Sequence, residues 1–430
     1  MNQRIRDRVT DSANLHKFLA GILVLAFVVR VGAMVLLHTW VFPTERAFGY
    51  ETGEIGYALA NGQGFSWPQT WRAVGPPGGG QFVQRDHPVP TSWEAPIYPI
   101  IVGLTFRVFG SYTALSAIIL ELFQVLLSML ICGVLFRLGQ LLFNDWAGLL
   151  AALIFAVYPA SVHFSVQKVE YSPLLTLLGL LIILQIIELS KRPSIGGSVA
   201  LGILFGVGTL VNPVILAFYP FGMLWLLVRF QSSWSSRLKY AVLIIGCCAA
   251  TMTPWLIRNY LVFDHFVFLR PNFTRELVIS NFPVEAYHME LENPKAVAGN
   301  DSQMSTAFNQ KAWSLIVQKP AQVLRTASTR FMQYWTYLGE SAGRGQFVAG
   351  AGYYPVLLFA VAGVWFAHRQ RQAQLLILFL LTMPLPFYVT WAVKGRFRFP
   401  LEPILILFAS YGVTVLVGIS TKTPSSAKES

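Results

Sequence analysis

The segment FLAGILVLAFVVRVGAMVLLHTW, residues 18–40, is an apolar run of the length that a helix needs to cross a bilayer. A transmembrane helix takes about 20 apolar residues, and only Arg30 and His38 place ionisable groups in this run. The run is too long for a signal-peptide core, and no small-residue cleavage pattern follows it. We therefore expect a retained transmembrane helix, preceded by a short cytoplasmic segment at residues 1–17.

Similar runs recur along the 430 residues and predict an all-α polytopic membrane protein. Hydrophobic residues make up 54% of the chain and charged residues 12%, about half the charge content of a soluble domain. This composition excludes a disordered chain, a basic nucleic-acid-binding domain and an ordinary soluble enzyme. The sequence predicts about ten transmembrane helices, six of them between residues 112 and 257 and three between 351 and 419. The runs lie near residues 18–40, 112–136, 146–165, 171–190, 196–211, 213–229, 239–257, 351–367, 374–393 and 400–419.

The net charge of +12 is explained largely by the expected topology. Lysine and arginine favour short cytoplasmic loops, so this excess needs no nucleic-acid partner. If the N-terminus is cytoplasmic, every short inside segment is basic. Both termini, including the tail at residues 420–430, are then on the cytoplasmic side of the inner (plasma) membrane. The inside cations are Arg4, Arg6, Arg8, Lys17, Arg137, Lys191, Arg192, Arg229, Arg237, Lys239, Arg369, Arg371, Lys422 and Lys428.

Two long segments, residues 41–111 and 258–350, are expected on the outer side. Connections of this length are uncommon and usually functional. Residues 96–110 are apolar and aromatic but too short to span, which favours an interfacial or re-entrant helix. There is no phosphate-binding loop or other nucleotide-hydrolysis motif, so an ATP-driven pump is not expected.

Carboxylates are the first candidates for chemistry. Glu51 and Glu54 are three residues apart and can share one helix face just after the first membrane helix. A carboxylate held at the membrane surface can act as a general base or bind a cation, whereas the alternative is a solvated acidic pair. Arg30 and Glu121 lie inside apolar runs and can form a structural pair with each other.

Further ionisable residues lie in the expected outer connections. Asp86 and His87 are neighbours in sequence, so a metal site there would need other ligands, and a surface turn is the alternative. His163 and Glu170 flank an outer hairpin, where polar residues near the membrane are functional candidates and an ordinary surface loop is the alternative.

Cations at the expected outer surface form the second group of candidates. They are Arg258, Arg270, Arg396 and Arg398. Arginine suits bidentate recognition of phosphate, and a lipid phosphate has its charge at this height. The alternative is ordinary contact with anionic lipids.

Five motifs occur in a characteristic order. An acidic motif at Glu51 precedes GQGF, which ends at Phe65, and PTSWEAPIYP at residues 90–99. TPWLIRNY at residues 253–260 and RFRFPLEP at 396–403 follow. This order resembles the GT-C superfamily of membrane glycosyltransferases, which includes bacterial protein O-mannosyltransferases and the lipid A aminoarabinose transferase.

The resemblance implies a GT-C-like fold, a polyprenyl-phosphate-linked sugar donor and an acceptor on the outer side. It implies an acidic catalytic base in the first outer loop, at the position of Glu51. The usual pattern there is an Asp-Glu pair, which this sequence lacks, so Glu54 stays open as the alternative. Relatives often carry a basic residue before the mid-chain proline, where this chain has Asn212.

The hypothesis is that Glu51 deprotonates an acceptor hydroxyl, which attacks the anomeric carbon with inversion. The outer arginines would stabilise the departing phosphate. The acceptor can be a protein, a lipid or a glycan, and no cofactor is implied beyond an open question about a divalent metal. The residues expected to line the substrate groove are Tyr50, Phe65, Trp93, Tyr98, Tyr260 and Glu170.

Two other classes of function remain as alternatives. One is a transporter or lipid flippase, for which paired repeats with broken helices and charges deep in several spans are typical. The other is a partner subunit that binds lipid without catalysis. Two large outer segments suit surface chemistry better than alternating access.

Overall fold

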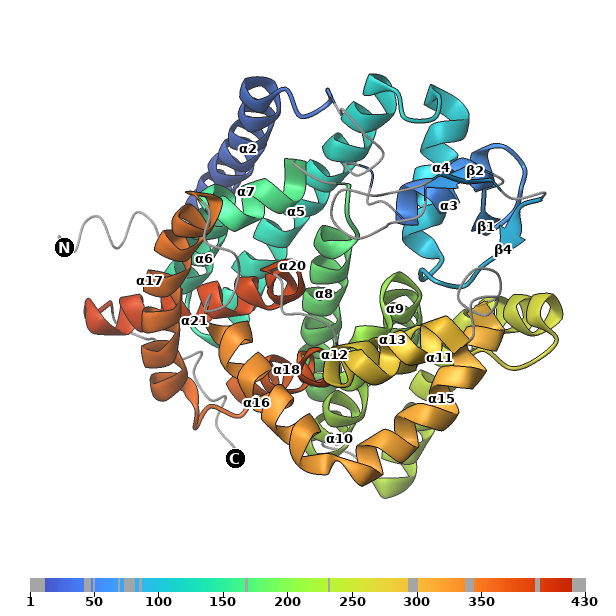
Figure 1. Ribbon diagram of the computed structural model, residues 1–430. Coiled ribbons are helices and arrows are strands. Elements are labelled where there is room, and N and C mark those ends of the chain that lie inside the picture. Colours follow the sequence, from blue (N-terminus) through green and yellow to red (C-terminus); the bar gives the residue numbers. More distant parts are fainter. Residues whose placement is uncertain are drawn as a thin grey trace.

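The structure is a computed structural model (Figure 1). It describes residues 12–41, 48, 51–68, 70–72, 82–84, 87–166, 169–230, 233–292, 301–336, 344–390 and 395–419.

The described residues are predominantly helical, with two small two-stranded sheets. The helices of the first half are α2 (Ser12–Leu37), α3 (Glu51–Ala60), α4 (Ile97–Phe109), α5 (Ala114–Leu142), α6 (Asp145–Val157), α7 (Pro159–Val166), α8 (Ser172–Lys191), α9 (Ile195–Val211), η2 (Pro213–Ala217) and α10 (Tyr219–Arg229). Those of the second half are α11 (Trp234–Phe263), α12 (Phe273–Asn281), α13 (Pro283–Glu292), α15 (Asp301–Gln318), α16 (Pro320–Trp335), α17 (Arg344–Ala367), α18 (Ala373–Thr382), α19 (Leu385–Val389), α20 (Gly395–Arg398), η3 (Phe399–Leu401) and α21 (Glu402–Leu416). The strands are β1 (Ser66–Trp67), β2 (Thr70–Arg72), β3 (Phe82–Gln84) and β4 (Val89–Pro90).

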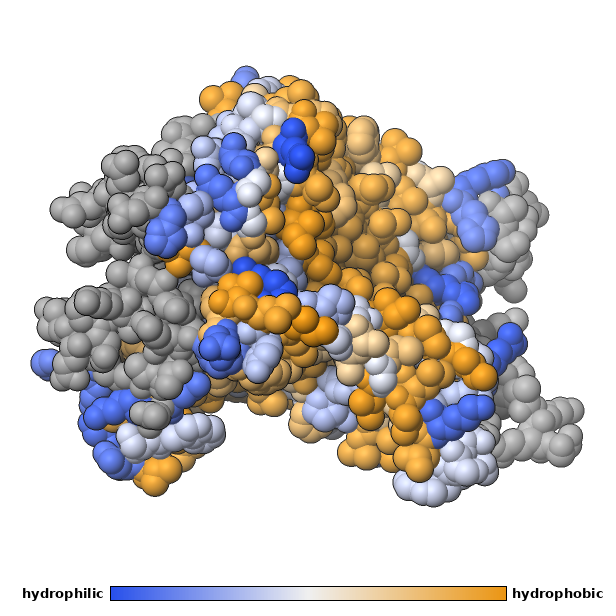
Figure 2. All heavy atoms as spheres, turned by 90° about the vertical axis from the view of Figure 1, so that its right-hand side faces the viewer, coloured by the Kyte–Doolittle hydropathy of each residue, from blue (hydrophilic) through white to orange (hydrophobic). Residues whose placement is uncertain are grey.

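The described part of each predicted apolar run is mostly helical, but the count of ten spans is not confirmed. Among the described residues, five helical segments are long and apolar enough to cross a membrane, or six if the bent pair α6–α7 is one span. Other runs form shorter apolar helices, such as α9 and the segment Ala373–Val389. Hydrophobic residues cover a broad area of the face in Figure 2, as expected of a surface that meets lipid.

The helices pack closely where glycines meet. A Cβ at Gly139 on α5 would overlap the backbone of Gly148 on α6. Gly363 on α17 and Gly412 on α21 make the same kind of close approach. Small residues let helix backbones approach within the bilayer, where water exclusion contributes little to packing.

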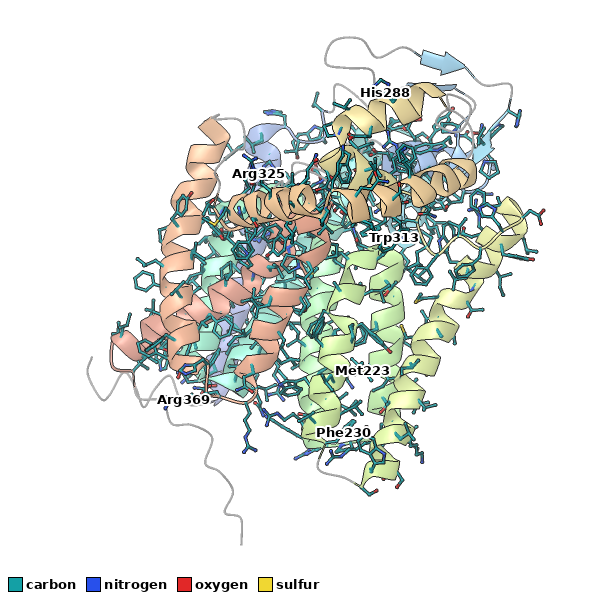
Figure 3. All side chains as sticks on the ribbon, turned by 60° about the horizontal axis from the view of Figure 1, so that its bottom comes forward. Met223, Phe230, His288, Trp313, Arg325 and Arg369 are labelled. Atoms are coloured by element: carbon teal, nitrogen blue, oxygen red, sulfur yellow. The ribbon has the colours of Figure 1, made fainter. Side chains whose placement is uncertain are left out.

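The outer segments form structure of their own. Residues 96–110 form the helix α4, and its place at the membrane interface stays a prediction. The second outer segment is mostly helical in its described part, and α12, α13, α15 and α16 cross one end of the bundle (Figure 3). His288 and Arg325 lie at this end, whereas Phe230 and Arg369 lie at the opposite end (Figure 3).

The predicted Arg30–Glu121 pair does not form, and Arg30 instead donates hydrogen bonds to backbone carbonyls at a helix break. α6 and α7 are bent by 54° at Tyr158–Pro159, where a proline interrupts helical hydrogen bonding. The buried guanidinium of Arg30 donates to the carbonyl oxygens of Ala156, at 2.8 Å, and Phe155, at 3.3 Å. Glu121 instead accepts from Thr39 Oγ1 at 2.7 Å. Arg30 thus satisfies carbonyls that the break releases.

Replacing Arg30 with Met should lower the free energy of unfolding by about 1–3 kcal/mol, since the buried Ala156 carbonyl loses its donor while the Phe155 carbonyl keeps the Ser161 hydroxyl. The measurement is thermal unfolding of the purified protein in detergent. Lys17→Met is the matched control, because Lys17 is an exposed cation on the same helix. Equal unfolding midpoints for the two variants would contradict this role.

Candidate functional site

Helix α3 carries two carboxylates in its first turn, in different surroundings. The helix begins at Glu51, so the macrodipole favours negative charge at both Glu51 and Glu54. Glu54 is buried and accepts a hydrogen bond from the Tyr112 hydroxyl at 3.2 Å. Tyr112 in turn packs against Phe48 and Phe106. Glu51 is only half-buried, so its carboxylate is the more accessible of the two.

Glycines hold α3 against α4. A Cβ at Gly56 would lie 2.7 Å from the Val102 side chain, and a Cβ at Gly103 would lie 2.8 Å from Leu59. Close packing of this kind fixes the relative position of the two helices. Because PTSWEAPIYP leads directly into α4, the packing also sets the distance between Glu51 and Glu94.

Glu94 is paired with Arg270, which comes from the second outer segment. The Arg270 guanidinium donates to the Trp93 carbonyl at 2.6 Å and to Glu94 Oε1 at 3.2 Å. Both side chains are largely buried. The pair therefore joins the two outer segments at one point.

Glu170 and Arg396 form a second ion pair beside the first. The distance from Arg396 Nη1 to Glu170 Oε1 is 3.6 Å. Glu170 is buried, whereas the Arg396 side chain is 39% exposed, so the cation is open to a further ligand. A small cavity adjoins Arg396. Tyr171, Leu175, Asn212, Val214, Met383, Phe387, Phe397 and Pro400 also line it.

These groups form one electrostatic unit, which we call the outer charge cluster: Glu51, Glu94, Glu170, Arg270 and Arg396. Burial raises the pKa of Glu94; Arg270 opposes this shift, and the charge of Glu51 adds to it. Arg396 interacts with the same three carboxylates and with Tyr171. Burial also raises the pKa of Tyr171, to about 12, so its phenol stays a hydrogen-bond donor at neutral pH.

Gln124, buried within α5, forms hydrogen bonds that fix the segments around the outer charge cluster. Its Oε1 accepts from the Tyr98 hydroxyl at 2.7 Å and from the backbone N–H of Glu170 at 2.8 Å. Its Nε2 donates to the Ser165 carbonyl at 3.0 Å. One amide therefore ties α4, α7 and the segment that carries Glu170 to a membrane-spanning helix.

Arg258, expected to bind phosphate, anchors the first outer segment in this structure. Its guanidinium donates to the carbonyls of Phe65, at 2.6 Å, and Thr91, at 2.7 Å. It also lies over the Trp255 ring, 4.9 Å from the centroid. These contacts fix one end of the antiparallel strand pair β1–β4, because Phe65 precedes β1, Thr91 follows β4 and the two residues are hydrogen-bonded neighbours. Phosphate binding by Arg258 stays a prediction.

Arg398 also has internal contacts, although Arg396 lies only two residues away. Its side chain is 1% exposed and donates to Glu402 Oε1 at 3.1 Å and to the Tyr334 carbonyl at 2.8 Å. The guanidinium lies over the Tyr353 ring at 4.1 Å. Neighbours at this spacing point to different sides of a helix. Only Arg396 joins the outer charge cluster, and Arg398 as a donor ligand stays a prediction.

The residues expected to line a substrate groove differ in their exposure to solvent. Phe65 and Tyr98 are buried, and Trp93 is half-buried next to the Glu94–Arg270 pair. Tyr260 is 55% exposed on α11. Tyr50 lies outside the described residues.

Metal binding by Asp86 and His87 stays a prediction. Asp86 lies outside the described residues, and His87 is exposed. Within the part of the chain that the structure describes, no three His, Cys, Asp or Glu side chains come together in a group that could hold a metal ion.

Sequence reasoning did not select Glu94, Tyr171 or Gln124. Glu94 lies inside a recognised motif, and only its burial beside other carboxylates distinguishes it. Gln124 has an observable signal, since a lone amide within a long apolar run must find partners.

The comparisons with known proteins agree with the resemblance. Residues 86–257, less than half of the chain, match the family model of dolichyl-phosphate-mannose-protein mannosyltransferases. The archaeal oligosaccharyltransferase AglB from Archaeoglobus fulgidus, solved with an inhibitory peptide and a dolichol-phosphate, has a TM-score of 0.56 at 16% identity. The similarity covers 93% of this chain and 50% of AglB. The predicted resemblance to GT-C membrane glycosyltransferases is thereby confirmed.

Two further solved structures are also similar to this chain. ArnT from Cupriavidus metallidurans, bound to undecaprenyl phosphate, has a TM-score of 0.38 at 14% identity, with 94% of this chain and 78% of that chain covered. The apo form of the Archaeoglobus fulgidus enzyme gives the same values as its complex, so this chain spans about half of the length of those structures. A comparison with curated protein sequences gives no match.

Replacing Gln124 with Leu should reduce activity about tenfold or more, because the Glu170 backbone loses its buried acceptor and Glu170 no longer holds Arg396 in place. The measurement is the donor KM and kcat, together with the unfolding midpoint. Gln140→Leu on the same helix is the control, since it removes the 2.7 Å bond to Asp145. A similar loss of activity in both variants would mean that Gln124 acts only through stability.

Proposed function

We propose that this chain is an inverting membrane glycosyltransferase that moves a sugar from a polyprenyl-phosphate-linked donor to an acceptor hydroxyl. The observation that carries the proposal is the outer charge cluster. In it the half-buried carboxylate Glu51 interacts electrostatically with Glu94 and Arg396, and the two arginines of the cluster, Arg270 and Arg396, suit phosphate. The family match and the shared fold support the same class of reaction.

Glu51 is the proposed general base. Its carboxylate takes the proton of the acceptor hydroxyl as the oxygen attacks the anomeric carbon from the face opposite the phosphate. The new bond joins the acceptor oxygen to the anomeric carbon, and the bond from that carbon to the phosphate oxygen breaks. Polyprenyl phosphate leaves with the bonding electrons, so no general acid is needed.

Arg396 is the proposed main ligand of the departing phosphate. It is the more exposed of the two arginines in the cluster, and its ion pair with the buried Glu170 fixes its position. A preorganised cation stabilises charge that develops in the transition state. In this scheme Arg258 and Arg398 act indirectly, because their hydrogen bonds hold the surrounding segments in place.

The proposed orientation places the cluster on the extracytoplasmic side and both termini in the cytoplasm of the inner (plasma) membrane. The basic short connections support this orientation. The acceptor is a hydroxyl of a protein, a lipid or a glycan at that surface.

The function is tested with purified protein in lipid nanodiscs and a radiolabelled polyprenyl-phosphate sugar. Transfer of label to an added hydroxyl acceptor, with inverted anomeric configuration, is the expected result. A parallel vesicle assay measures movement of the intact lipid. Lipid movement without transfer would replace the proposal with a flippase.

Glu51→Gln should reduce transfer by about a hundred- to ten-thousandfold, since the amide cannot accept the proton. Glu54→Gln is the internal comparison and should cost activity much less, because Glu54 bonds to Tyr112. The measurement is the initial rate at saturating donor, with folding checked by the unfolding midpoint. Full activity of Glu51→Gln and loss in Glu54→Gln would reverse the assignment.

Arg396→Gln should reduce kcat by about a hundred- to a thousandfold, because the phosphate loses a charged partner. Arg396→Lys should restore part of the loss, since the charge returns without the bidentate geometry. Arg325→Gln, which removes an exposed cation from α16, serves as the control. Equal effects of Arg325→Gln and Arg396→Gln would count against the proposed role.

A further inference from the structure

A second polar site lies at the far end of the bundle. Helix α8 begins beside the outer charge cluster, next to Tyr171, and ends at Lys191 after 20 residues. At about 1.5 Å per residue this is about 30 Å, the thickness of the bilayer hydrocarbon core. Around the end of α8 is a cavity of about 450 Å³, within the size range of ligand sites.

The lining of this cavity is basic and only partly neutralised. Arg137 from α5 and Lys191 and Arg192 from the end of α8 supply three cations, and Glu188 supplies one carboxylate. The Arg137–Glu188 distance is 3.7 Å and both side chains are about half exposed, so this pair contributes little to stability. Two positive charges remain for a ligand.

The rest of the lining suits a headgroup with an apolar attachment. Leu141 and Leu189 face the same cavity. The start of α9 closes it, where Gln185 Nε2 donates to the Gly197 carbonyl at 3.0 Å. A Cβ at Gly197 would lie 2.9 Å from Leu189 and 2.8 Å from Ser194 Oγ, so the glycine permits this close approach. Backbone N–H groups in the first turn of a helix also favour a bound anion.

We propose that this cavity binds a phosphate-bearing group of about two negative charges, supplied by an anionic phospholipid with its acyl chains along the partly exposed Leu141. Basic pockets between helix ends at the cytoplasmic membrane surface suit such headgroups. The site is separate from sugar transfer, about 30 Å away, so the two proposals can fail independently.

The test uses the full chain in a neutral detergent, with diphosphatidylglycerol, phosphatidylcholine or inorganic pyrophosphate added. The apparent affinity is measured by native mass spectrometry and by the shift of the unfolding midpoint. The variant is Arg137→Gln with Lys191→Gln. The control is Arg369→Gln with Arg371→Gln, which removes the same charge from exposed positions outside the cavity.

The expected result is that diphosphatidylglycerol binding weakens about tenfold or more in the cavity variant only, with phosphatidylcholine unaffected. Arg137→Lys with Lys191→Arg should retain binding. Pyrophosphate binding as tight as lipid binding, lost in the same variant, would support the site and identify a soluble ion as its source. Equal weakening in variant and control, or none in either, would overturn the proposal.

Discussion

The amide of Gln124 inside a membrane helix is the contact on which the outer site depends. Burying an amide without hydrogen-bond partners costs free energy, and here three different segments supply those partners. Tyr98 brings the first outer segment, Ser165 brings α7, and the Glu170 backbone brings the connection to α8. Because the amide is rigidly held in α5, these segments share one reference point, and the two ion pairs above it are positioned together.

A connected set of polar groups extends this support through the bundle. Ser165 also contacts Arg30, whose guanidinium satisfies the carbonyls at the α6–α7 break. After the break, α7 places the Ser165 carbonyl within hydrogen-bond distance of Gln124. The carbonyls that the break leaves unpaired would be costly in lipid, and Arg30 donates to them. The structure thereby relates an arginine in the first apolar run to the geometry around Glu170, although the two residues are 140 positions apart in sequence.

The arginines show why residue type alone does not assign a role. Arg258, Arg270, Arg396 and Arg398 all lie at the expected outer surface and all suit phosphate. In the structure, Arg258 and Arg398 bond to backbone carbonyls and a carboxylate within the fold, whereas Arg270 and Arg396 join one cluster of carboxylates. The difference depends on which way each side chain points, and a spacing of two residues on a short helix is enough to separate Arg396 from Arg398.

The sequence by itself determined the helical membrane class, the places of the apolar helices and the resemblance to GT-C glycosyltransferases. These follow from local hydrophobicity and ordered motifs, which need no long-range contacts. Tertiary structure alone decided the partners of Arg30 and the different surroundings of Glu51 and Glu54. It also brought Glu94 to the cluster. These outcomes depend on contacts between residues far apart in the chain, so no local pattern encodes them.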